Sequence, residues 1–188
     1  MRSSSFDPSA PADADLITER LALRVWTPGD VEAVLDGARP SDGAEALSDG
    51  ARPAHWAGDF PAEGDQVIAG LLGEHPAWLG PYGHRLIVER DSGLVVGSLG
   101  LFWPPQDGAV EIGYGVVASR RGRGYASEAT RALTAFALTA PEVHTVLAHA
   151  EPANPASIRV LEKAGFRRVS STEELARFEV TAPYPFQP

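Results

Sequence analysis

The chain has 188 residues, of which 44% are hydrophobic, and this is enough for a single globular domain with a sizeable core. Its formal net charge of −9 at pH 7, without a basic stripe, argues against nucleic-acid binding. It contains no cysteine, which excludes disulfides, thiol nucleophiles and cysteine-ligated zinc and makes the cytoplasm the expected location.

The two ends and the histidines add further expectations. No secretory leader opens the sequence and no apolar run approaches about 18 residues, so neither secretion nor membrane spanning is indicated. Residues 1–15 are expected to form a flexible tail, and residues 16–188 a single domain. The histidines lack a recognised ligand spacing, so no metal is expected.

In chain order, the first predicted strand runs from Leu21 to Val25, where apolar residues alternate with polar or small ones. A turn at residues 27–30 leads into a helix over residues 31–37. Residues 38–64 are rich in glycine, proline and aspartate and are predicted to form a long loop. A short helix is expected over residues 66–72.

Three strands are predicted in the middle of the chain. Residues 85–90 and 94–102 form the first two, joined by Asp91-Ser92-Gly93, which has the chemistry of a hairpin turn. The third runs from Val110 to Val117. Consecutive strands joined by short connections favour an antiparallel meander.

The most informative segment is Arg121 to Ala126, with the sequence RGRGYA, which lies between the third of these strands and a predicted helix over residues 127–140. A helix N-terminus carries unpaired N–H groups and partial positive charge, so it binds anions readily. Gly122 and Gly124 allow turn conformations that other residues avoid. The usual dinucleotide and ATP loops are both absent, since Ser127 replaces a third glycine and no Gly-Lys-Ser/Thr occurs. Taken alone, the segment also fits a tight strand-to-helix turn.

The remaining elements are a strand over residues 143–150, a helix after Asn154 that ends at Gly165, and strands over residues 167–170 and 176–181. Asn154 is followed by a proline, so it also fits a purely structural role as a helix N-cap.

Together these segments resemble the GNAT superfamily of N-acetyltransferases. The glycine loop matches the family's cofactor pattern, Arg/Gln-x-x-Gly-x-Gly/Ala, at Arg121, Gly124 and Ala126. The run from Glu111 to Val117 resembles the preceding strand in the branch that includes the ribosomal-protein N-terminal (alanine/serine) acetyltransferases. Asn154 to Phe166 resembles the second motif, Asn-x-x-Ser followed by a helix that ends in Gly-Phe.

The resemblance implies an α/β fold of the mixed-sheet (α+β) kind in one domain. A central twisted mixed β-sheet of about six to seven strands would be flanked by about four helices. A V-shaped opening is expected between the fourth and fifth predicted strands, Val110 to Val117 and Val143 to Ala150. Acetyl-CoA would lie in this opening.

The resemblance also assigns acetyl-CoA as the co-substrate, with no metal. Backbone groups of the strand would pair with the pantetheine arm, the glycine loop would hold the pyrophosphate, and the second motif would face the pantetheine or the adenosine. The N–H of Val117 would polarise the thioester carbonyl. The implied cofactor-binding residues are Val116, Val117, Arg121, Gly122, Arg123, Gly124, Tyr125, Ala126, Asn154, Ser157 and Arg159.

Acetyl transfer needs an unprotonated amine, and Glu111 is the predicted base. On a regular strand Glu111 shares a face with Gly113 and Gly115, which leave room for a substrate. The alternative is an exposed glutamate or one paired with an arginine. Many family members carry a tyrosine in the second motif as general acid, and none stands there in this chain, so Ser157, Tyr125 and water are the remaining candidates.

The acceptor pocket is expected near the aromatic residues upstream, because this region caps the acyl end in similar proteins. Trp56, Phe60, Tyr82 and His84 are the predicted substrate-binding residues, and aromatics beside acids suit a cation. The alternative is that Trp56 and Phe60 only pack this segment onto the sheet.

The predicted function is transfer of an acetyl group from acetyl-CoA to a primary amine, either a protein N-terminus or a small molecule. Two alternatives stay open: a non-catalytic acyl-CoA-binding or regulatory module of the same fold, and an interaction domain whose glycine loop is merely a turn. A homodimer is expected by resemblance, and no nucleic acid or membrane partner.

Overall fold

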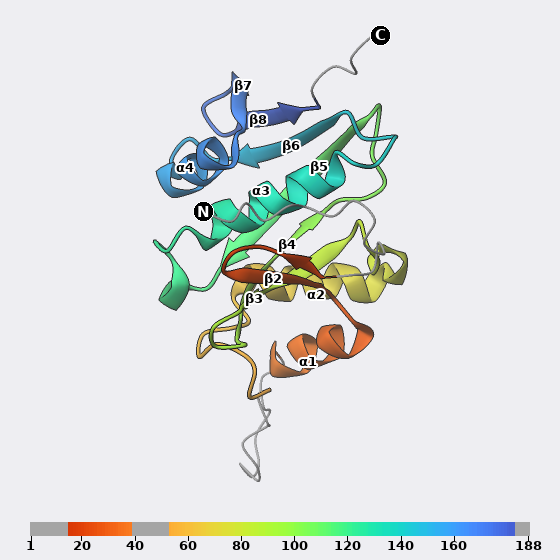
Figure 1. Ribbon diagram of the computed structural model, residues 1–188, viewed down its shortest axis with the longest axis vertical. Coiled ribbons are helices and arrows are strands. Elements are labelled where there is room, and N and C mark those ends of the chain that lie inside the picture. Colours follow the sequence, from red (N-terminus) through yellow and green to blue (C-terminus); the bar gives the residue numbers. More distant parts are fainter. Residues whose placement is uncertain (1–14, 39–52, 183–188) are drawn as a thin grey trace.

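An eight-stranded mixed β-sheet with four α-helices makes up the fold of the computed structural model, which describes residues 15–38 and 53–182 (Figure 1). All but one residue of the predicted 1–15 tail, and residues 39–52 of the predicted loop, lie outside the described residues. The strands are β1 (Leu16–Ile17), β2 (Leu21–Val25), β3 (His84–Glu89), β4 (Val95–Leu101), β5 (Ala109–Val116), β6 (Thr145–Ala150), β7 (Arg167–Ser171) and β8 (Ala176–Thr181). The helices are α1 (Pro28–Ala38), α2 (Glu63–Glu74), α3 (Tyr125–Ala137) and α4 (Pro155–Ala164), with short 3-10 turns at Pro76–Trp78 and Ala118–Arg120.

The strand order is β1-β2-β3-β4-β5-β6-β8-β7, and every neighbouring pair is antiparallel except β5 and β6. The parallel pair follows from the connection, because α3 carries the chain back along the sheet before β6 begins. Between β3 and β4 the predicted hairpin is present, with Gly93 at φ 71° and its N–H donating to the Glu89 carbonyl at 2.8 Å.

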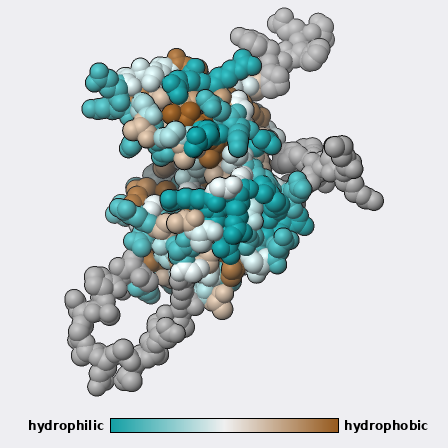
Figure 2. All heavy atoms as spheres, turned by 90° about the vertical axis from the view of Figure 1, so that its left-hand side faces the viewer, coloured by the Kyte–Doolittle hydropathy of each residue, from teal (hydrophilic) through white to brown (hydrophobic). Residues whose placement is uncertain are grey.

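The helices lie in two groups. In Figure 1 α3 and α4 run beside β5 and β6, whereas α1 and α2 lie together near β2 and β3. The core between them and the sheet contains fully buried residues such as Leu23, Ile87, Leu133, Val146 and Phe178. Figure 2 shows a mostly hydrophilic surface with apolar atoms gathered near its middle. No helix among the described residues is long and apolar enough to cross a bilayer.

The sheet opens between β5 and β6. The two strands pair only at Ala109–Thr145, Val110–Val146 and Glu111–Leu147, although β5 continues to Val116 and β6 to Ala150. This fork is the predicted V-shaped opening between the fourth and fifth predicted strands. The sheet has one strand more than predicted because β1 has only two residues, too few to show a periodicity.

Candidate active site

The glycine loop lies at the open end of the fork. Gly122 and Gly124 have φ angles of 75° and 83°, in the left-handed region that favours glycine. Gly124 is the N-cap of α3 and gives it no side-chain hydrogen bond. The first-turn amides therefore have neither an intrahelical nor a side-chain acceptor. This arrangement suits an anion.

Arg20, from the turn before β2, holds the loop in place. Its Nη1 donates to the Arg123 carbonyl at 2.8 Å, and its Nη2 lies 2.6 Å from Glu128 Oε2 in the first turn of α3. The guanidinium also lies over the Tyr125 ring, 5.0 Å from its centroid. Arg20 thus holds the loop through the Arg123 carbonyl and Glu128, and not through the N–H groups that would bind an anion.

Tyr125, a predicted candidate for the general acid, is engaged elsewhere. Its hydroxyl donates to Glu89 Oε1 at 2.6 Å, and Arg120 and Arg123 lie near the same carboxylate at 3.3 and 3.7 Å. The hydroxyl of Ser92, together with that of Tyr125, lowers the pKa of Glu89, while the bond to Glu89 raises the pKa of Tyr125. Tyr125 is not among the residues that line the cavity, so it anchors the loop.

The exposed edge of β5 follows from two hydrogen bonds. Phe102 N–H donates to the Glu111 carbonyl and Val117 N–H donates to the Val96 carbonyl, both at 2.9 Å. Since backbone groups alternate along a strand, those of Tyr114 and Val116 point to the opposite edge, where β6 has diverged. The predicted role of the Val117 N–H at the thioester needs correction, because that N–H is already bonded to β4. Val116 is the residue whose N–H faces the fork.

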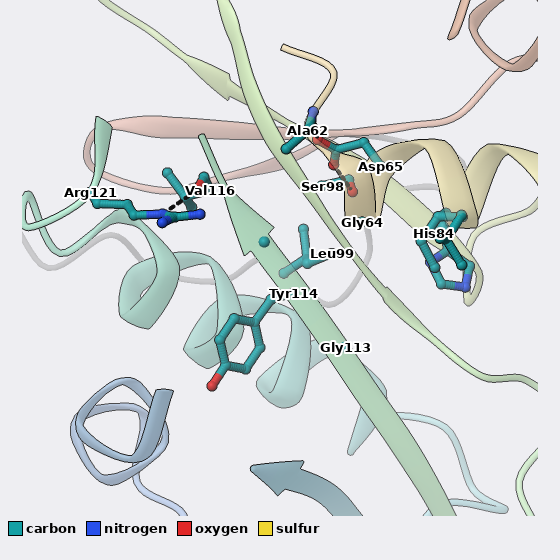
Figure 3. A pocket seen from close by; sticks show the side chains of 13 residues that line it. Ala62, Gly64, Asp65, His84, Ser98, Leu99, Gly113, Tyr114, Val116 and Arg121 are labelled. Atoms are coloured by element: carbon teal, nitrogen blue, oxygen red, sulfur yellow. Dashed lines mark hydrogen bonds between the residues drawn. The ribbon is translucent and has the colours of Figure 1, made fainter. Parts of the chain in front are cut away.

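A cavity of about 450 Å³ lies between α2 and strands β3, β4 and β5 (Figure 3). Gly113 and Gly115 line it, and a Cβ at Gly115 would meet no atom within 4 Å. At one end Arg121 donates from Nε to the Val116 carbonyl at 3.1 Å. The cavity therefore connects the glycine loop with the bare face of β5 that the sequence predicted.

The opposite wall is polar and buried. Asp65 in the first turn of α2 is 3% exposed, and its carboxylate accepts from Ser98 Oγ at 2.5 Å and from Ala62 N at 2.8 Å. Burial raises the pKa of Asp65, against the lowering effect of both hydrogen bonds. His84, at the start of β3, is 2% exposed, and burial lowers its pKa to about 4. His84 was predicted, whereas Asp65 and Ser98 were missed because no sequence motif links α2 to β4.

Glu111, the predicted base, lies where the fork begins. Its Oε1 is 2.9 Å from Nδ1 of His149 on β6, and its side chain is 42% exposed. It does not line the cavity, although it is on the same face of β5 as Gly113 and Gly115. The alternative to a catalytic role was an exposed glutamate or one paired with an arginine, and the partner is a histidine instead. No sequence pattern indicates His149 as the partner, because the pairing of β5 with β6 sets this contact.

Across the fork, Tyr114 of β5 contacts Ser157 of α4. The Tyr114 hydroxyl lies 2.8 Å from Ser157 Oγ and 3.1 Å from the Ser157 carbonyl, and burial raises its pKa. Asn154 Oδ1 accepts a hydrogen bond from Ser157 N at 3.0 Å, as expected if Asn154 is the N-cap of α4. Arg159, on the same helix, is exposed. The sequence analysis did not single out Tyr114 as a site residue, because an aromatic residue on a predicted strand is usually part of the hydrophobic core.

The other predicted substrate residues lie away from this cavity. Trp56 and Phe60 are 7% and 2% exposed and contact each other edge to face at 5.1 Å. Tyr82 is stacked on Trp103 and on Phe136 of α3, at 4.5 and 4.9 Å. The packing alternative therefore describes the contacts of Trp56 and Phe60, and His84 is the predicted substrate residue that lines the cavity.

A family model described as "Acetyltransferase (GNAT) domain" matches residues 20–167. The chain belongs to the GNAT family of acetyltransferases. A curated relative, an uncharacterized N-acetyltransferase from Bacillus subtilis called YjdG, is 37% identical over 82 residues, which cover 43% of this chain and 49% of that protein. The chain thus spans about half the length of the curated relatives that it matches.

Solved structures of GNAT proteins share the fold. A Vibrio cholerae protein assigned as a ribosomal-protein-serine acetyltransferase superposes with a TM-score of 0.60 at 19% identity, covering 91% of this chain and 99% of that one. AAC(6')-Ib in complex with paromomycin and acetyl-CoA superposes with a TM-score of 0.55 at 22% identity, covering 87% and 94%. At these identities the likeness concerns the fold alone.

Proposed function

We propose that this GNAT protein is an enzyme that transfers the acetyl group of acetyl-CoA to a primary amine. One observation carries the proposal: the fork between β5 and β6 opens toward an uncapped, glycine-bearing helix N-terminus, and a cavity along β5 extends to Arg121, the first residue of the glycine loop. A thioester with a long polar arm and a pyrophosphate fits such a path. The acetyl-CoA complex of AAC(6')-Ib, which has this fold, supports the choice of co-substrate.

The residues present fit acetyl-CoA. The amides from Gly122 to Ala126 would hold the pyrophosphate, because left-handed glycines and the missing side-chain cap leave them accessible. The edge groups of Tyr114 and Val116 would pair with the pantetheine amides as a neighbouring strand does. When bound, acetyl-CoA supplies an activated acyl carbon and a thiolate leaving group.

The chain's own residues would orient the amine and manage its protons. Gly115 leaves open space beside the strand edge for the amine nitrogen. The Val116 N–H points to the edge on which negative charge would develop at the carbonyl oxygen. Ser157, whose hydroxyl is held by Tyr114, is the candidate proton donor to sulfur. Burial keeps Tyr114 protonated, since it raises the pKa of that phenol.

Glu111 remains the predicted base in this scheme, as the group that takes the proton of the ammonium before attack. It lies at the apex of the fork, and His149 Nδ1 lies 2.9 Å from its carboxylate. Glu111→Gln keeps the shape of the side chain and removes its basicity, so turnover at neutral pH should fall while acetyl-CoA affinity stays unchanged. Turnover equal to that of the wild type would show that another group accepts the proton.

The test of the proposed function is a CoA-release assay with acetyl-CoA and a panel of amines: peptides with a free N-terminal alanine or serine, and simple alkyl amines. The chain has no cysteine, so a thiol reagent detects released CoA without a protein background. Mass spectrometry of the amine then identifies the product. Acetylation of a panel member at the amine nitrogen is the expected result. Calorimetric binding of acetyl-CoA without acetylation of any amine would favour the non-catalytic acyl-CoA-binding module.

A further inference from the structure

His84 is a buried titratable side chain that lacks a partner. Within residues 15–38 and 53–182, neither of its ring nitrogens has a hydrogen-bond partner, although the side chain is 2% exposed. A structural histidine in a protein core ordinarily has both nitrogens paired, because an unpaired buried polar group costs free energy. The unpaired imidazole lines the cavity beside the bare face of β5 (Figure 3).

The neighbouring residues make room for this ring. His84 is paired with Gly100 of β4, and Gly100 with Gly113 of β5, so the three form one row across the sheet. A Cβ at Gly100 would lie 2.1 Å from His84 Nδ1, so the imidazole occupies the space that glycine leaves. Phe102, edge to face with His84 at 5.3 Å, also contacts the Gly113 position.

We propose that His84 is a catalytic residue: a ring nitrogen of its neutral imidazole accepts the proton that the acceptor amine loses as the C–N bond forms. This inference rests on the proposed function and makes the cavity wall between His84 and the Asp65–Ser98 pair the subsite for a primary amine. Asp65 acts as a positioning residue, since its two hydrogen bonds hold the start of α2 against β4.

The proton balance is complete without a further reactant. The amine reaches the subsite as R–NH₂, its lone pair forms the C–N bond, and the C–S bond breaks with its electron pair on sulfur. The amine nitrogen becomes strongly acidic as this bond forms, so a weak base is sufficient to take its proton. Burial lowers the pKa of His84 to about 4, and the imidazole is therefore neutral at pH 7 and able to accept. The thiolate takes a proton through the Ser157 hydroxyl, and His84 returns its proton to solvent, so the products are the amide and free CoA.

The experiment compares His84→Gln with the matched control His75→Gln, which makes the same change at an exposed histidine after α2. The substrate is the panel amine that the wild type acetylates best, either a peptide N-terminus or an alkyl amine. For His84→Gln, kcat should fall roughly 10²-fold or more, as for loss of a general base, with acetyl-CoA affinity retained. His75→Gln should behave as the wild type. A His84→Gln kcat within about threefold of the wild type would overturn the proposal.

Chemical rescue separates proton transfer from space filling. His84→Ala leaves room for a small ring, and added imidazole should restore part of the turnover. Pyrazole has the same shape but is a far weaker base, so it should not. Equal rescue by both would assign His84 a packing role and overturn the proposal. A wild type that binds acetyl-CoA but acetylates no amine would contradict the proposed function itself, a result distinct from an active wild type with an equally active His84→Gln.

Discussion

Gly115 lies on the floor of the cavity, where a Cβ would meet no atom within 4 Å. In Gly115→Val the added methyl groups would fill the space assigned to the amine and the thioester. Stability should change by less than about 1 kcal/mol, because valine favours strands and glycine weakens them. Turnover should fall at least about tenfold, since displacement by one ångström costs more than that. Steady-state kinetics and a thermal melt measure both, with Gly70→Ala, which also faces open space, as the control. Undiminished turnover would place the reaction elsewhere.

Gly124 has φ 83°, and a Cβ there would lie 3.4 Å from Arg20 Nη2. Gly124→Ala should cost roughly 1–2 kcal/mol in backbone strain and lower the Tm by roughly 2–8 °C. Acetyl-CoA affinity, measured by calorimetry, should fall as well, because the strained residue is the N-cap that presents the amides. Gly122 has a similar φ, but a Cβ there would meet no atom within 4 Å. Gly122→Ala therefore measures the backbone strain without the contact with Arg20. Unaltered affinity in both variants would argue that the loop is only a turn.

Sequence patterns found the residues whose role depends on local geometry. The glycines of the loop and Asn154 were predicted because a helix terminus needs those residue types wherever it occurs. His84 was predicted only as one of several aromatic residues, two of which are buried against each other. Asp65, Ser98 and Tyr114 were not predicted, because contacts between residues 33 or more positions apart decide what each side chain faces.

At the scale of elements, the N-terminus of α3 is tied to the turn before β2 by Glu128. This carboxylate accepts from Thr18 Oγ1 at 2.7 Å and from Arg20 N at 2.9 Å. Burial raises the pKa of Glu128, but these hydrogen bonds and the Arg20 guanidinium outweigh it, so the pKa is lowered from 4.5 in the folded state. A lowered folded pKa means that the stabilisation is present above the unfolded pKa and is lost as the pH falls through the folded one.

Glu128→Gln should therefore lower the Tm at pH 7, by an amount equivalent to roughly 0.5–1 kcal/mol for a partly exposed pair at a helix N-terminus. The difference from the wild type should shrink as the pH falls below 4.5, where the carboxylate of the unfolded chain becomes protonated, and should vanish only below the lower pKa of the folded state. Thermal melts from pH 7 to pH 3 test this. Glu142→Gln, at an exposed acid after α3, should show no such trend. A difference in Tm that persists at low pH would mean that packing of the Glu128 side chain, and not its charge, accounts for the stabilisation.

The helix α4 offers a second test at this scale. Asn154 Oδ1 accepts from Ser157 N at 3.0 Å, so Asn154→Ala should cost about 1 kcal/mol as the loss of an N-cap does. If Asn154 serves only as a cap, acetyl-CoA affinity should be unchanged once the folded fraction is accounted for. A calorimetric Kd that rises tenfold, equivalent to about 1.4 kcal/mol, would support the predicted contact with the cofactor. Asn154→Ser, which can still cap, should retain the stability in either case.

Element boundaries were predictable where the sequence carries a strong period or punctuation. The predicted strands at residues 85–90 and 94–102 differ from β3 and β4 by one residue at each end, because a glycine turn separates them. The short strand β1 was missed, and so was the pairing of Trp56 with Val95, the first residue of β4, since both depend on a partner distant in the sequence. The fork was predicted from the family resemblance. Hydrophobic periodicity alone could not predict it, because it does not show where two parallel strands stop pairing.

At the scale of the whole molecule, the three β5–β6 pairs are the only strand pairing that joins the two halves of the described sheet. A ligand in the fork would replace the missing pairing and couple these halves. Acetyl-CoA at 100 times its Kd should stabilise the fold by about 2.7 kcal/mol. For a chain of this size the Tm should rise by roughly 5–11 °C.

Hydrogen exchange locates this stabilisation. With acetyl-CoA the amides from Gly122 to Ala126 and those of Tyr114 and Val116 should exchange more slowly, because they gain acceptors. The Val117 amide, already bonded to Val96, should change less than Val116. This contrast between adjacent residues distinguishes a ligand that pairs with the strand edge from one that only rigidifies the fold. Equal protection of both amides, or protection confined to α1 and α2, would contradict binding in the fork.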